Sequence, residues 1–471
     1  MEKFLFAKVE AWVFGLVGVV GAAGLMAFGA IVTYVGEGGE KLGGFGDFVY
    51  GVAKVPSNAL AILKGKAAGG DFSAKELVIA YPRGAYQPVD EMLNGPATDA
   101  PIVWKSAAWD EGAAPIRAPL ALMFRMNKQK DEHLAFFDER RNFIRSFPVK
   151  AESFSGKFSA LSGNSPPFVL DDGTVVVFPS GGDGLYRKSL CGDILWSVPG
   201  LYHHSFSVAD GKLGVLGLPE DNLTAEDHDN LRWNRSEILN IIDIETGRIE
   251  RSVTLNEIAA ANAGIVDPFS WRLWRNTLNE YGVLAEDVIH LNKLEILPEA
   301  LADDYPDFPA GAWMVSSRNF NLIAVIHPET LEILWHSQGH TEGQHDPEFV
   351  GDNRILVFNN ALDKNVEDAQ SPRNFSSVRE VNVSTGAWRD VYNAVDAKGF
   401  TPHSGEIDFT PNGGLIMTLT KQGRYLEVSP DGDVLTDFIN ANADGGVYWT
   451  KHAQYLSPKQ LETVSELSCE N

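Results

Sequence analysis

Residues 326–335 read Ile326-His327-Pro328-Glu329-Thr330-Leu331-Glu332-Ile333-Leu334-Trp335. An apolar strand, a polar turn and a second strand ending in tryptophan make the pattern of a β-hairpin. The pattern recurs at 190–196, 242–249, 381–388 and 428–435, with gaps of 47 to 84 residues between successive turns. Multi-stranded units at such intervals, with insertions in the longer gaps, predict an all-β propeller. A long β-sandwich is the structural alternative, but it does not require the same hairpin repeatedly.

A second pattern precedes several of these hairpins. Segments 204–212, 348–355 and 406–414 each read as a strand, a turn rich in Asp, Asn and Gly, and another strand. In a propeller, residues that enter the innermost strand of a unit point toward the central axis. We therefore expect the histidines near these positions to converge, although they lie far apart in the sequence: His203, His204, His290, His345 and His403.

Three short blocks in the middle of the chain carry the chemistry. They are DVIHLN (287–292), VSSR (315–318) and QHD (344–346), and each lies beside a β-like apolar run. Arginine offers a planar fork of donors that suits a tetrahedral oxyanion such as a sulfuryl or phosphoryl group. A neutral imidazole can act as nucleophile, base or acid near neutral pH. Together these residue types predict group-transfer chemistry on an oxyanion.

Composition limits the function classes. The chain has 471 residues, of which 44% are hydrophobic and 22% charged, and these are globular values. A formal net charge of −24 argues against a nucleic-acid partner, which requires a basic face. No phosphate-binding GxxxxGK[ST] motif is present, so a nucleotide-linked donor is not indicated. No tight His/Asp/Glu triplet demands a metal, and we predict neither a metal nor a cofactor.

Three regions are expected along the chain. Residues 11–35 carry no charge and are long enough to span a bilayer, so residues 1–35 are interpreted as a cytoplasmic stub and an uncleaved transmembrane anchor. Residues 36–75 are a Gly-rich linker that holds either a membrane-surface helix or a plain linker helix. Residues 76–471 form the propeller. Two insertions, polar 216–235 and helical 255–286, are expected to shape one propeller face.

The two cysteines leave two alternatives open. Cys191 and Cys469 have no metal-ligand spacing. They either form a disulfide in an oxidising compartment or remain as one buried thiol and one thiol in the tail.

The blocks quoted above, in this order, resemble the bacterial arylsulfotransferase family, which uses aryl sulfate esters as donors. HSGEIDFTPNGGLIMT (403–418) and GRYLEVSPDGDV (423–434) also resemble the family's penultimate blade, and the similarity covers roughly residues 160–455. The resemblance implies a six-bladed propeller on the periplasmic side of the inner membrane, held by a single-pass helix. It also implies ping-pong transfer of a sulfuryl group from an aryl sulfate to a phenol.

Site roles follow from the same resemblance. His345 would be the nucleophile that forms a sulfohistidine, and His290 and Arg318 would hold the sulfuryl oxygens. His203 or His204 would exchange a proton with the phenol oxygen, and the doublet does not tell which. Asn292 and His403 are predicted to bind substrate. We expect structural roles for the remaining histidines considered: His327, His336, His340 and His452.

Three departures from the family pattern stand out. Lys293 replaces a polar residue after the H-x-N motif, residues 298–311 lengthen a hairpin, and Phe358-Asn359-Asn360 replaces F-D-N. These departures keep two non-catalytic alternatives open. One is a membrane-tethered propeller that binds a ligand without turnover. The other is a structural subunit of a membrane assembly, with a homo-oligomer or a membrane-protein partner.

Overall fold

The computed structural model describes residues 86–88, 102–106, 118–125, 132–149, 165–178, 182–218, 237–262, 289–361, 375–409, 413–441 and 447–469. The chain divides into two units, Met1–Gly70 and Asp71–Asn471, and every described residue belongs to the second. The predicted anchor and linker therefore lie outside the described residues. Within those ranges, no helix is both long enough and apolar enough to cross a membrane.

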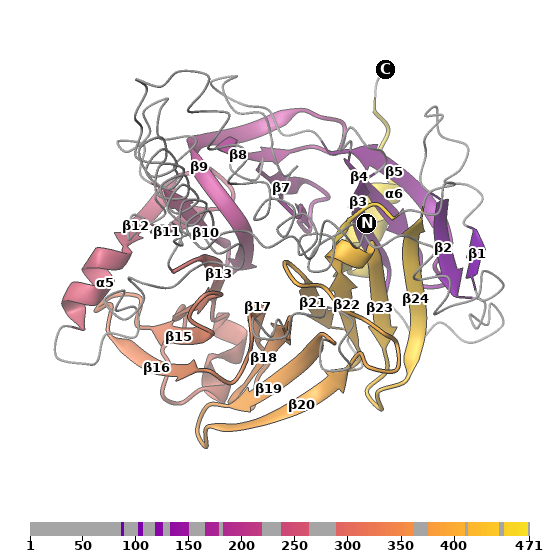
Figure 1. The fold of residues 1–471 in the computed structure, drawn as a ribbon. Helices are drawn as coiled ribbons and strands as arrows, with labels where there is room; N and C mark the ends of the chain where they lie inside the picture. Colours follow the sequence, from indigo (N-terminus) through magenta and orange to yellow (C-terminus); the bar gives the residue numbers. More distant parts are fainter. Residues whose placement is uncertain are drawn as a thin grey trace, which may run out of the picture. The chain divides into compact units, whose positions relative to one another are not determined.

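The strands form five antiparallel sheets, three of which have four strands (Figure 1). The first, in the order β25-β3-β4-β5, consists of Thr450–Tyr455, Leu120–Arg125, Glu132–Phe137 and Phe143–Pro148. The second runs from β13 to β16: Leu291–Ile296, Trp313–Ser317, Leu322–Ile326 and Ile333–Gln338. The third runs from β17 to β20: His345–Phe349, Arg354–Asn359, Ser377–Asn382 and Ala387–Asn393.

The other two sheets are larger. A seven-stranded sheet contains β6 to β12: Phe168–Val169, Val175–Val177, Gly182–Lys188, Ile194–Ala209, Lys212–Leu218, Ile238–Asp243 and Ile249–Thr254. A six-stranded sheet, in the order β21-β22-β23-β24-β2-β1, consists of Glu406–Phe409, Leu415–Leu419, Arg424–Val428, Val434–Ala441, Ile102–Ser106 and Tyr86–Pro88. Four short helices complete the described elements: α5 (Leu255–Ala261), η5 (Glu299–Asp304), η6 (Thr420–Gln422) and α6 (Pro458–Glu466).

The predicted all-β propeller architecture is confirmed, and the hairpins found in the sequence form its outer strands. The quoted segment 326–335 joins β15 to β16, and its turn is closed by hydrogen bonds between His327 and Glu332 and between Leu331 and His327. The four related segments likewise join β8 to β9, β11 to β12, β19 to β20 and β23 to β24. In the β11–β12, β15–β16 and β19–β20 hairpins the first strand is mostly buried and the second is more exposed, because the second strand is the edge of its sheet. The second strand of the β23–β24 hairpin is mostly buried and pairs with β2.

The expected six blades are not what the strand pairing gives, because the described strands form five sheets. The physical reason is β9, which continues through 16 residues. Its first half pairs with β8 as an outer strand, and its second half pairs with β10 as an inner strand. No turn interrupts it, so strands that would form two sheets are joined in one.

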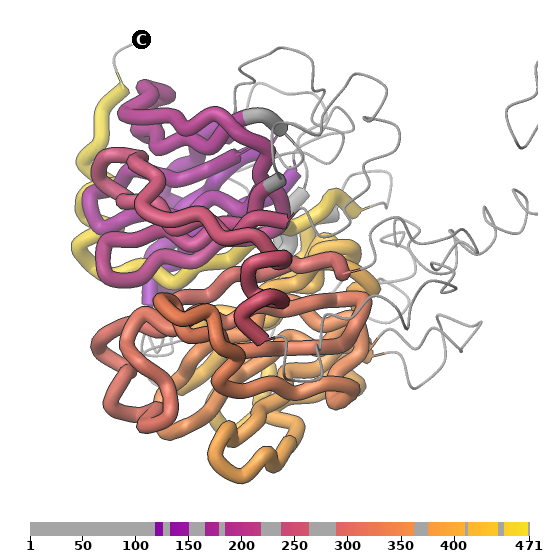
Figure 2. The backbone as a smooth tube through the Cα atoms, turned by 90° about the vertical axis from the view of Figure 1, so that its left-hand side faces the viewer, coloured from indigo at the N-terminus to yellow at the C-terminus, as the bar shows by residue number. Residues whose placement is uncertain are grey.

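The innermost strands lie around a common centre. β9 contacts β13, β13 contacts β17, β17 contacts β21, and β21 contacts β25. Figure 1 shows β13, β17 and β21 at the inner ends of their sheets, and β9 within the seven-stranded sheet. The C-terminal β25 pairs with β3, so one sheet is built from both ends of the described chain. Figure 2 shows this yellow C-terminal segment beside the purple strands of the early sequence.

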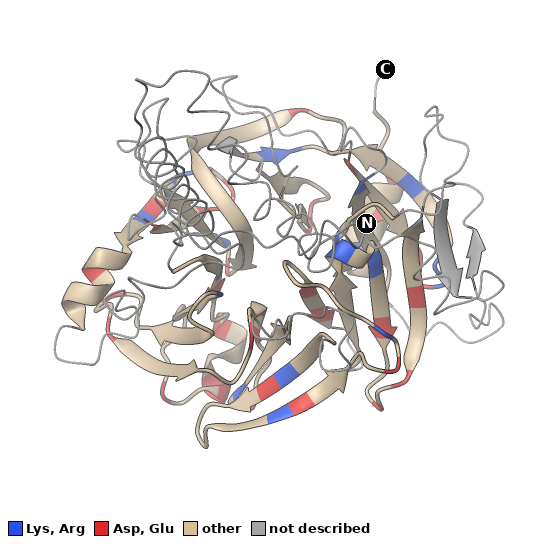
Figure 3. Cartoon of the chain, in the orientation of Figure 1, with Lys and Arg blue, Asp and Glu red and all other residues tan. Residues whose placement is uncertain are grey.

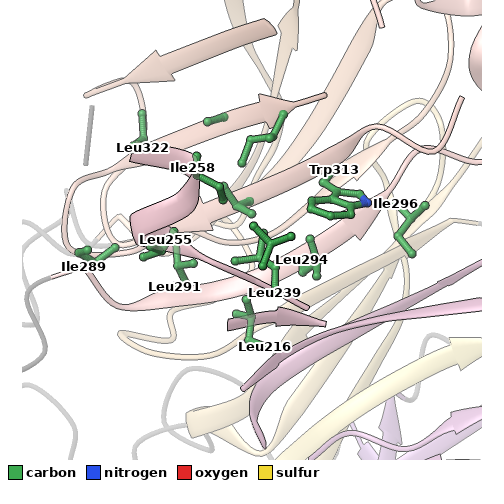
Figure 4. Close-up of a cluster of buried hydrophobic side chains, with 14 of the residues drawn as sticks. Leu216, Leu239, Leu255, Ile258, Ile289, Leu291, Leu294, Ile296, Trp313 and Leu322 are labelled. Carbon is green, nitrogen blue, oxygen red and sulfur yellow. The ribbon is translucent and has the colours of Figure 1, made fainter. Parts of the chain in front are cut away.

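Apolar side chains fill the space between neighbouring sheets. In Figure 4, leucines of β10 and β11 meet Leu255 and Ile258 of α5, together with Leu291, Leu294 and Trp313 of the next sheet. Complete burial of one such side chain stabilises the fold by about 1.5–3 kcal/mol. A Thr254–Glu257 capping box starts α5 and keeps this helix against the cluster.

Outer strands carry paired charges instead. Figure 3 shows basic and acidic positions next to each other on β19 and β20. Arg379 pairs with Asp390 across the two strands, and Arg389 pairs with Glu380, each at 2.8 Å. Because β20 is the edge of its sheet, these charges also disfavour pairing with a strand of another molecule.

Cys191 and Cys469 form a disulfide, with their Cα atoms 5.3 Å apart. This decides between the two alternatives left by the sequence. The bond ties the tail after α6 to the β8–β9 turn, across a separation of 278 residues. Gln460 of α6 adds a hydrogen bond to the carbonyl of Val169.

The predicted insertions are only partly described. The first was expected to begin at residue 216, but β10 continues to Leu218 because Leu216 and Gly217 pair with β11. Of the second, α5 forms the beginning, and residues 263–286 lie outside the described residues. The lengthened hairpin at 298–311 contains η5, and its Tyr305 and Phe308 pack against Phe349.

Candidate functional site

Four inner strands contain a β-bulge at a similar position. The pairing of β9 with β10 skips His204 and Ser205, and the pairing of β13 with β14 skips Asn292. In β17 the skipped residues are Asp346 and Pro347, and in β25 the skipped residue is Lys451. A bulge adds a residue to one strand and changes the direction of its side chain. The repeated bulge therefore redirects one polar side chain in each of the four sheets.

These redirected side chains share a cavity of about 190 Å³. His204, Asn292, Asp346 and Lys451 line it, together with His345 at the start of β17. The positive φ angles of His204 (63°) and Asp346 (48°) are uncommon for residues other than glycine. Such strain is typical of functional sites, where the surrounding structure holds an unfavourable backbone in place.

The hydrogen bonds of His345 define its protonation. Its Nδ1 lies 3.0 Å from the carbonyl oxygen of Gly343 and 2.8 Å from Oδ1 of Asn360. Both partners are acceptors, so Nδ1 carries the proton and Nε2 keeps its lone pair. Burial, followed by the positive charge of Arg318, lowers the pKa of His345 to about 3. The imidazole is therefore neutral at physiological pH, with Nε2 available as a nucleophile.

Asn360 makes this tautomer unambiguous. Its amide nitrogen donates to the carbonyl oxygens of Thr401 (2.8 Å) and Ser404 (2.7 Å). An amide with both hydrogens used in this way must direct its oxygen toward His345. The backbone N–H of Ser404 donates a hydrogen bond of 3.3 Å to Nε2 of His345, as this tautomer allows.

A row of histidines lies next to His345. Nδ1 of His203 is 2.7 Å from Nδ1 of His204, and Nε2 of His204 is 3.0 Å from Nε2 of His290. Burial, followed by the proximity of His290 and His203, places the pKa of His204 well below its ordinary value. His204 is therefore a neutral hydrogen-bonding group rather than a stored proton.

Arg318 and His403 form a second pair at the site. Nη2 of Arg318 donates to Nδ1 of His403 at 2.7 Å. Burial, followed by the charge of Arg318, lowers the pKa of His403 to about 2, so this ring remains a neutral acceptor. The backbone N–H of Arg318 donates to the carbonyl of His290 at 3.0 Å, which fixes the two predicted oxygen-binding residues next to each other.

The structure thus brings the predicted site residues together. His204, Asn292 and His345 line the cavity, whereas His203, His290, Arg318 and His403 are connected to these residues by hydrogen bonds or by the electrostatic effects described above. Asn292 donates to the carbonyl of Gln344 at 2.7 Å and so fixes the residue before His345. Gln344, fully buried, donates to the carbonyls of Ser317 and Leu322.

The other histidines lie elsewhere. His327 accepts backbone hydrogen bonds within its own hairpin turn, and His340 stacks on Trp388. His336 is an exposed residue of β16. His452 forms an ion pair with Glu406, and that contact raises the pKa of the His452 ring despite its burial.

The departures from the expected motif have structural explanations. Lys293 is buried and forms ion pairs with Asp346 (2.7 Å), Glu348 (2.9 Å) and Glu295 (3.5 Å) in an adjacent cavity of about 150 Å³. Asn359 accepts the N–H of Glu342 and donates to Ser377, so it fastens the loop before His345. Asn360 makes the contact with the His345 ring.

The profile of the arylsulfotransferase (ASST) family matches residues 167–441, more than half of the chain. The chain belongs to the arylsulfotransferase family. The match includes six of the predicted site residues: His203, His204, His290, Arg318, His345 and His403. No curated protein matches this arylsulfotransferase sequence significantly.

Several solved structures are similar to this family member at low identity. A Bacteroides caccae protein of unknown function is 11% identical, with a TM-score of 0.44, and the match covers 72% of this chain and 98% of the other. Virginiamycin B lyase from Staphylococcus aureus is 9% identical, with a TM-score of 0.36 and coverages of 68% and 83%. Likenesses of this size support no inference about the activity of this arylsulfotransferase-family chain.

Sequence reasoning missed three residues of the site in this arylsulfotransferase family member. The sequence motifs that contain Asn360 and Ser404 do not indicate that these two residues contact His345. Lys451 lies in β25, outside the segments recognised as inner strands. The available signal was the segment 447–456 near the C-terminus, which is rich in aromatic residues and could form the further inner strand that ring closure requires.

Proposed function

We propose that this protein is a membrane-anchored arylsulfotransferase that forms a sulfohistidine on His345. One observation carries the proposal: hydrogen bonds to Gly343 and Asn360 hold the proton of His345 on Nδ1, which leaves the Nε2 lone pair for attack. A neutral, buried imidazole with a fixed tautomer is the form required of a nitrogen nucleophile. The donor is an aryl sulfate ester and the acceptor is a phenol.

In the first half-reaction, Nε2 of His345 attacks sulfur, the N–S bond forms and the bond from sulfur to the aryl oxygen breaks. Negative charge gathers on the sulfuryl oxygens and on the departing oxygen. Arg318 and His290 are the donors that we assign to the sulfuryl oxygens, with substrate contacts from Asn292 and His403. Fixed donors of this kind act most strongly in a buried site, because they need no reorganisation during the reaction.

The phenol oxygen also needs a proton as it leaves. His203 and His204 are the candidates implied by the family resemblance. The low pKa of His204 weighs against a role as the acid, because a ring that is not protonated has no extra proton to give. We assign His203 and His204 to the positioning of His290 instead.

The surroundings of the enzyme are part of the proposal. The charge-free residues 11–35 would anchor the chain in the inner membrane, with the propeller in the periplasm. The disulfide between Cys191 and Cys469 supports an oxidising compartment. We also propose that the seven-stranded sheet accounts for two blades that share β9, which would give six blades.

The test is a transfer assay with a chromogenic aryl sulfate and a phenol. We expect activity from the wild type and none from His345→Ala. Arg318→Lys should fold normally yet lose about 10²–10³-fold in rate, because an ammonium does not reproduce the two-pronged contact. His340→Ala is the control, since His340 is exposed and lies against Trp388 on an outer strand. Absence of transfer by the wild type across several donors and acceptors would refute the proposal and favour a propeller that only binds or scaffolds.

A further inference from the structure

Lys451 occupies in β25 the position that His204, Asn292 and Asp346 occupy in their own inner strands. In each case the residue lies in a bulge, is skipped by the ladder and lines the cavity that contains His345. Three of the four equivalent positions already belong to the group around the nucleophile. The repeated geometry therefore assigns the fourth, Lys451, to the same cavity wall.

The contacts of Lys451 hold its amino group beside the cavity that contains His345. Its side chain is only 9% exposed, and Nζ lies 2.9 Å from Oε1 of the fully buried Glu132. Glu132 also pairs with Arg125 at 3.2 Å, so its charge remains compensated when the lysine is neutral. The carboxylates of Glu406 and Asp346 and the rings of His345 and His204 also line the cavity.

Burial lowers the pKa of Lys451 to about 8. The charge of Glu132 opposes this change, Arg125 adds to it, and Glu406 opposes it weakly. The group is therefore protonated at neutral pH but able to lose its proton readily. This places the acidity of the ammonium between that of an ordinary lysine and that of an ordinary histidine.

We propose that the Lys451 ammonium protonates the departing aryl oxygen, and that the resulting amine later removes the proton from the accepting phenol. The inference rests on the proposed function and deepens it. It identifies Lys451 as the group that carries the proton in the reaction, a role that neutral His204 does not fill.

The two half-reactions balance with Lys451 in this role. In the first, His345 Nε2 gains the sulfuryl group, the aryl oxygen gains the proton of Lys451, and a phenol leaves. The ring then carries the sulfuryl group on Nε2 and a proton on Nδ1, which faces the acceptors Gly343 and Asn360. In the second, neutral Lys451 takes the proton of the incoming phenol, whose oxygen attacks sulfur and breaks the N–S bond.

Trp449 places an aromatic wall beside this amine. It lines the same cavity two residues before Lys451, and its ring is held by Lys421, 3.2 Å from the ring centroid, and by Arg125, at 4.0 Å. An aryl group against this wall would lie in the cavity that Lys451 and the nucleophile also line. A small phenolic ester is therefore the substrate class that suits this side of the cavity.

The test compares two donors that differ in their need for protonation. Phenyl sulfate releases a basic phenolate, whereas 4-nitrophenyl sulfate releases a stable one. We expect Lys451→Met to lose about 10²–10⁴-fold with phenyl sulfate, the usual contribution of a general acid, and only a few-fold with 4-nitrophenyl sulfate. Lys459→Met, an exposed lysine of α6, is the matched control and should leave both rates unchanged.

A uniform loss with both donors, or no loss, would overturn the role of Lys451 while leaving the proposed function intact. Absence of transfer in the wild type would overturn both. If Lys451→Met does not fold, a double variant with Lys451→Met and Glu132→Gln removes both charges of this ion pair. This variant should show the same dependence of the rate on the leaving group. Equal losses in that variant would also contradict the proposal.

Discussion

Asn360 helps to fix the tautomer of His345 through a contact of 2.8 Å between its Oδ1 and the ring Nδ1, beside the 3.0 Å contact of the same nitrogen with the carbonyl of Gly343. The amide has no alternative orientation, because its nitrogen is committed to the carbonyls of Thr401 and Ser404. A residue 15 positions further along the chain therefore shares with Gly343 the control of which nitrogen of the nucleophile is reactive. Such supporting contacts commonly change activity by about 10–100-fold when they are removed.

The first prediction concerns this contact. Asn360→Leu keeps the side-chain volume similar but leaves the Gly343 carbonyl as the one described acceptor for Nδ1 of His345. The ring is then held less firmly, so we expect kcat to fall by about 10–100-fold with little change in KM. The adjacent Asn359 provides the control, because its hydrogen bonds reach Glu342 and Ser377 instead. Asn359→Ala should lower the free energy of unfolding by about 1 kcal/mol and leave kcat within a few-fold. Equal kinetic effects of the two substitutions would contradict the assignment.

The second prediction is a pH dependence of stability. Burial and Arg318 lower the pKa of His403 from 6.5 to about 2, with smaller effects of Lys421, His345 and His290. A pKa that is lower in the folded state contributes stability above pH 6.5, and that contribution is lost as the pH falls toward 2. His403→Gln should therefore flatten the fall of the Tm between pH 6.5 and pH 4 relative to the wild type. Parallel Tm curves for the two proteins would refute the low pKa.

The third prediction concerns the disulfide. Replacing both Cys191 and Cys469 by serine should lower the free energy of unfolding by about 2–4 kcal/mol, because the unfolded chain gains conformational freedom. Denaturant unfolding with and without a reductant measures this difference. The wild type under reducing conditions should match the double variant. An unchanged midpoint in both would show that the bond does not form in solution.

The fourth prediction concerns the membrane. The uncharged residues 11–35 should keep the full-length protein in the membrane fraction after a carbonate wash and release it only with detergent. A variant with two lysines introduced near the middle of this segment is the control and should be released, because buried charges are costly in a bilayer. Recovery of a soluble wild-type product that begins near residues 30–40 would identify a cleaved signal peptide instead.

Most of the fold could be predicted from the sequence, because the strand and turn patterns that indicate it lie within short segments. A hairpin such as 326–335 contains both strands and the turn, so spacing alone identifies it. The continuous β9 was not predicted, since the segment 194–209 contains Gly200 and reads as two strands rather than one. The convergence of His203, His204, His290 and His345 followed from their repeated place before inner strands.

The rest of the site depends on pairing that no local pattern encodes. Lys451 faces the cavity because β25 has one more residue than β3 between two aligned pairs. That bulge depends on the register between strands from opposite ends of the chain. Asn360 acts through carbonyls at 401 and 404, and the disulfide joins residues 278 positions apart.

The most direct test of the central claim is the mass of the His345 peptide after a brief reaction with an aryl sulfate and no acceptor. The account predicts that this peptide gains one sulfuryl group, that the group is stable in alkali and labile in acid, and that a phenol removes it. His345→Ala should give no labelled peptide and no transfer. Transfer that persists in His345→Ala, or a sulfuryl group on another residue of the active wild type, would contradict the sulfohistidine mechanism.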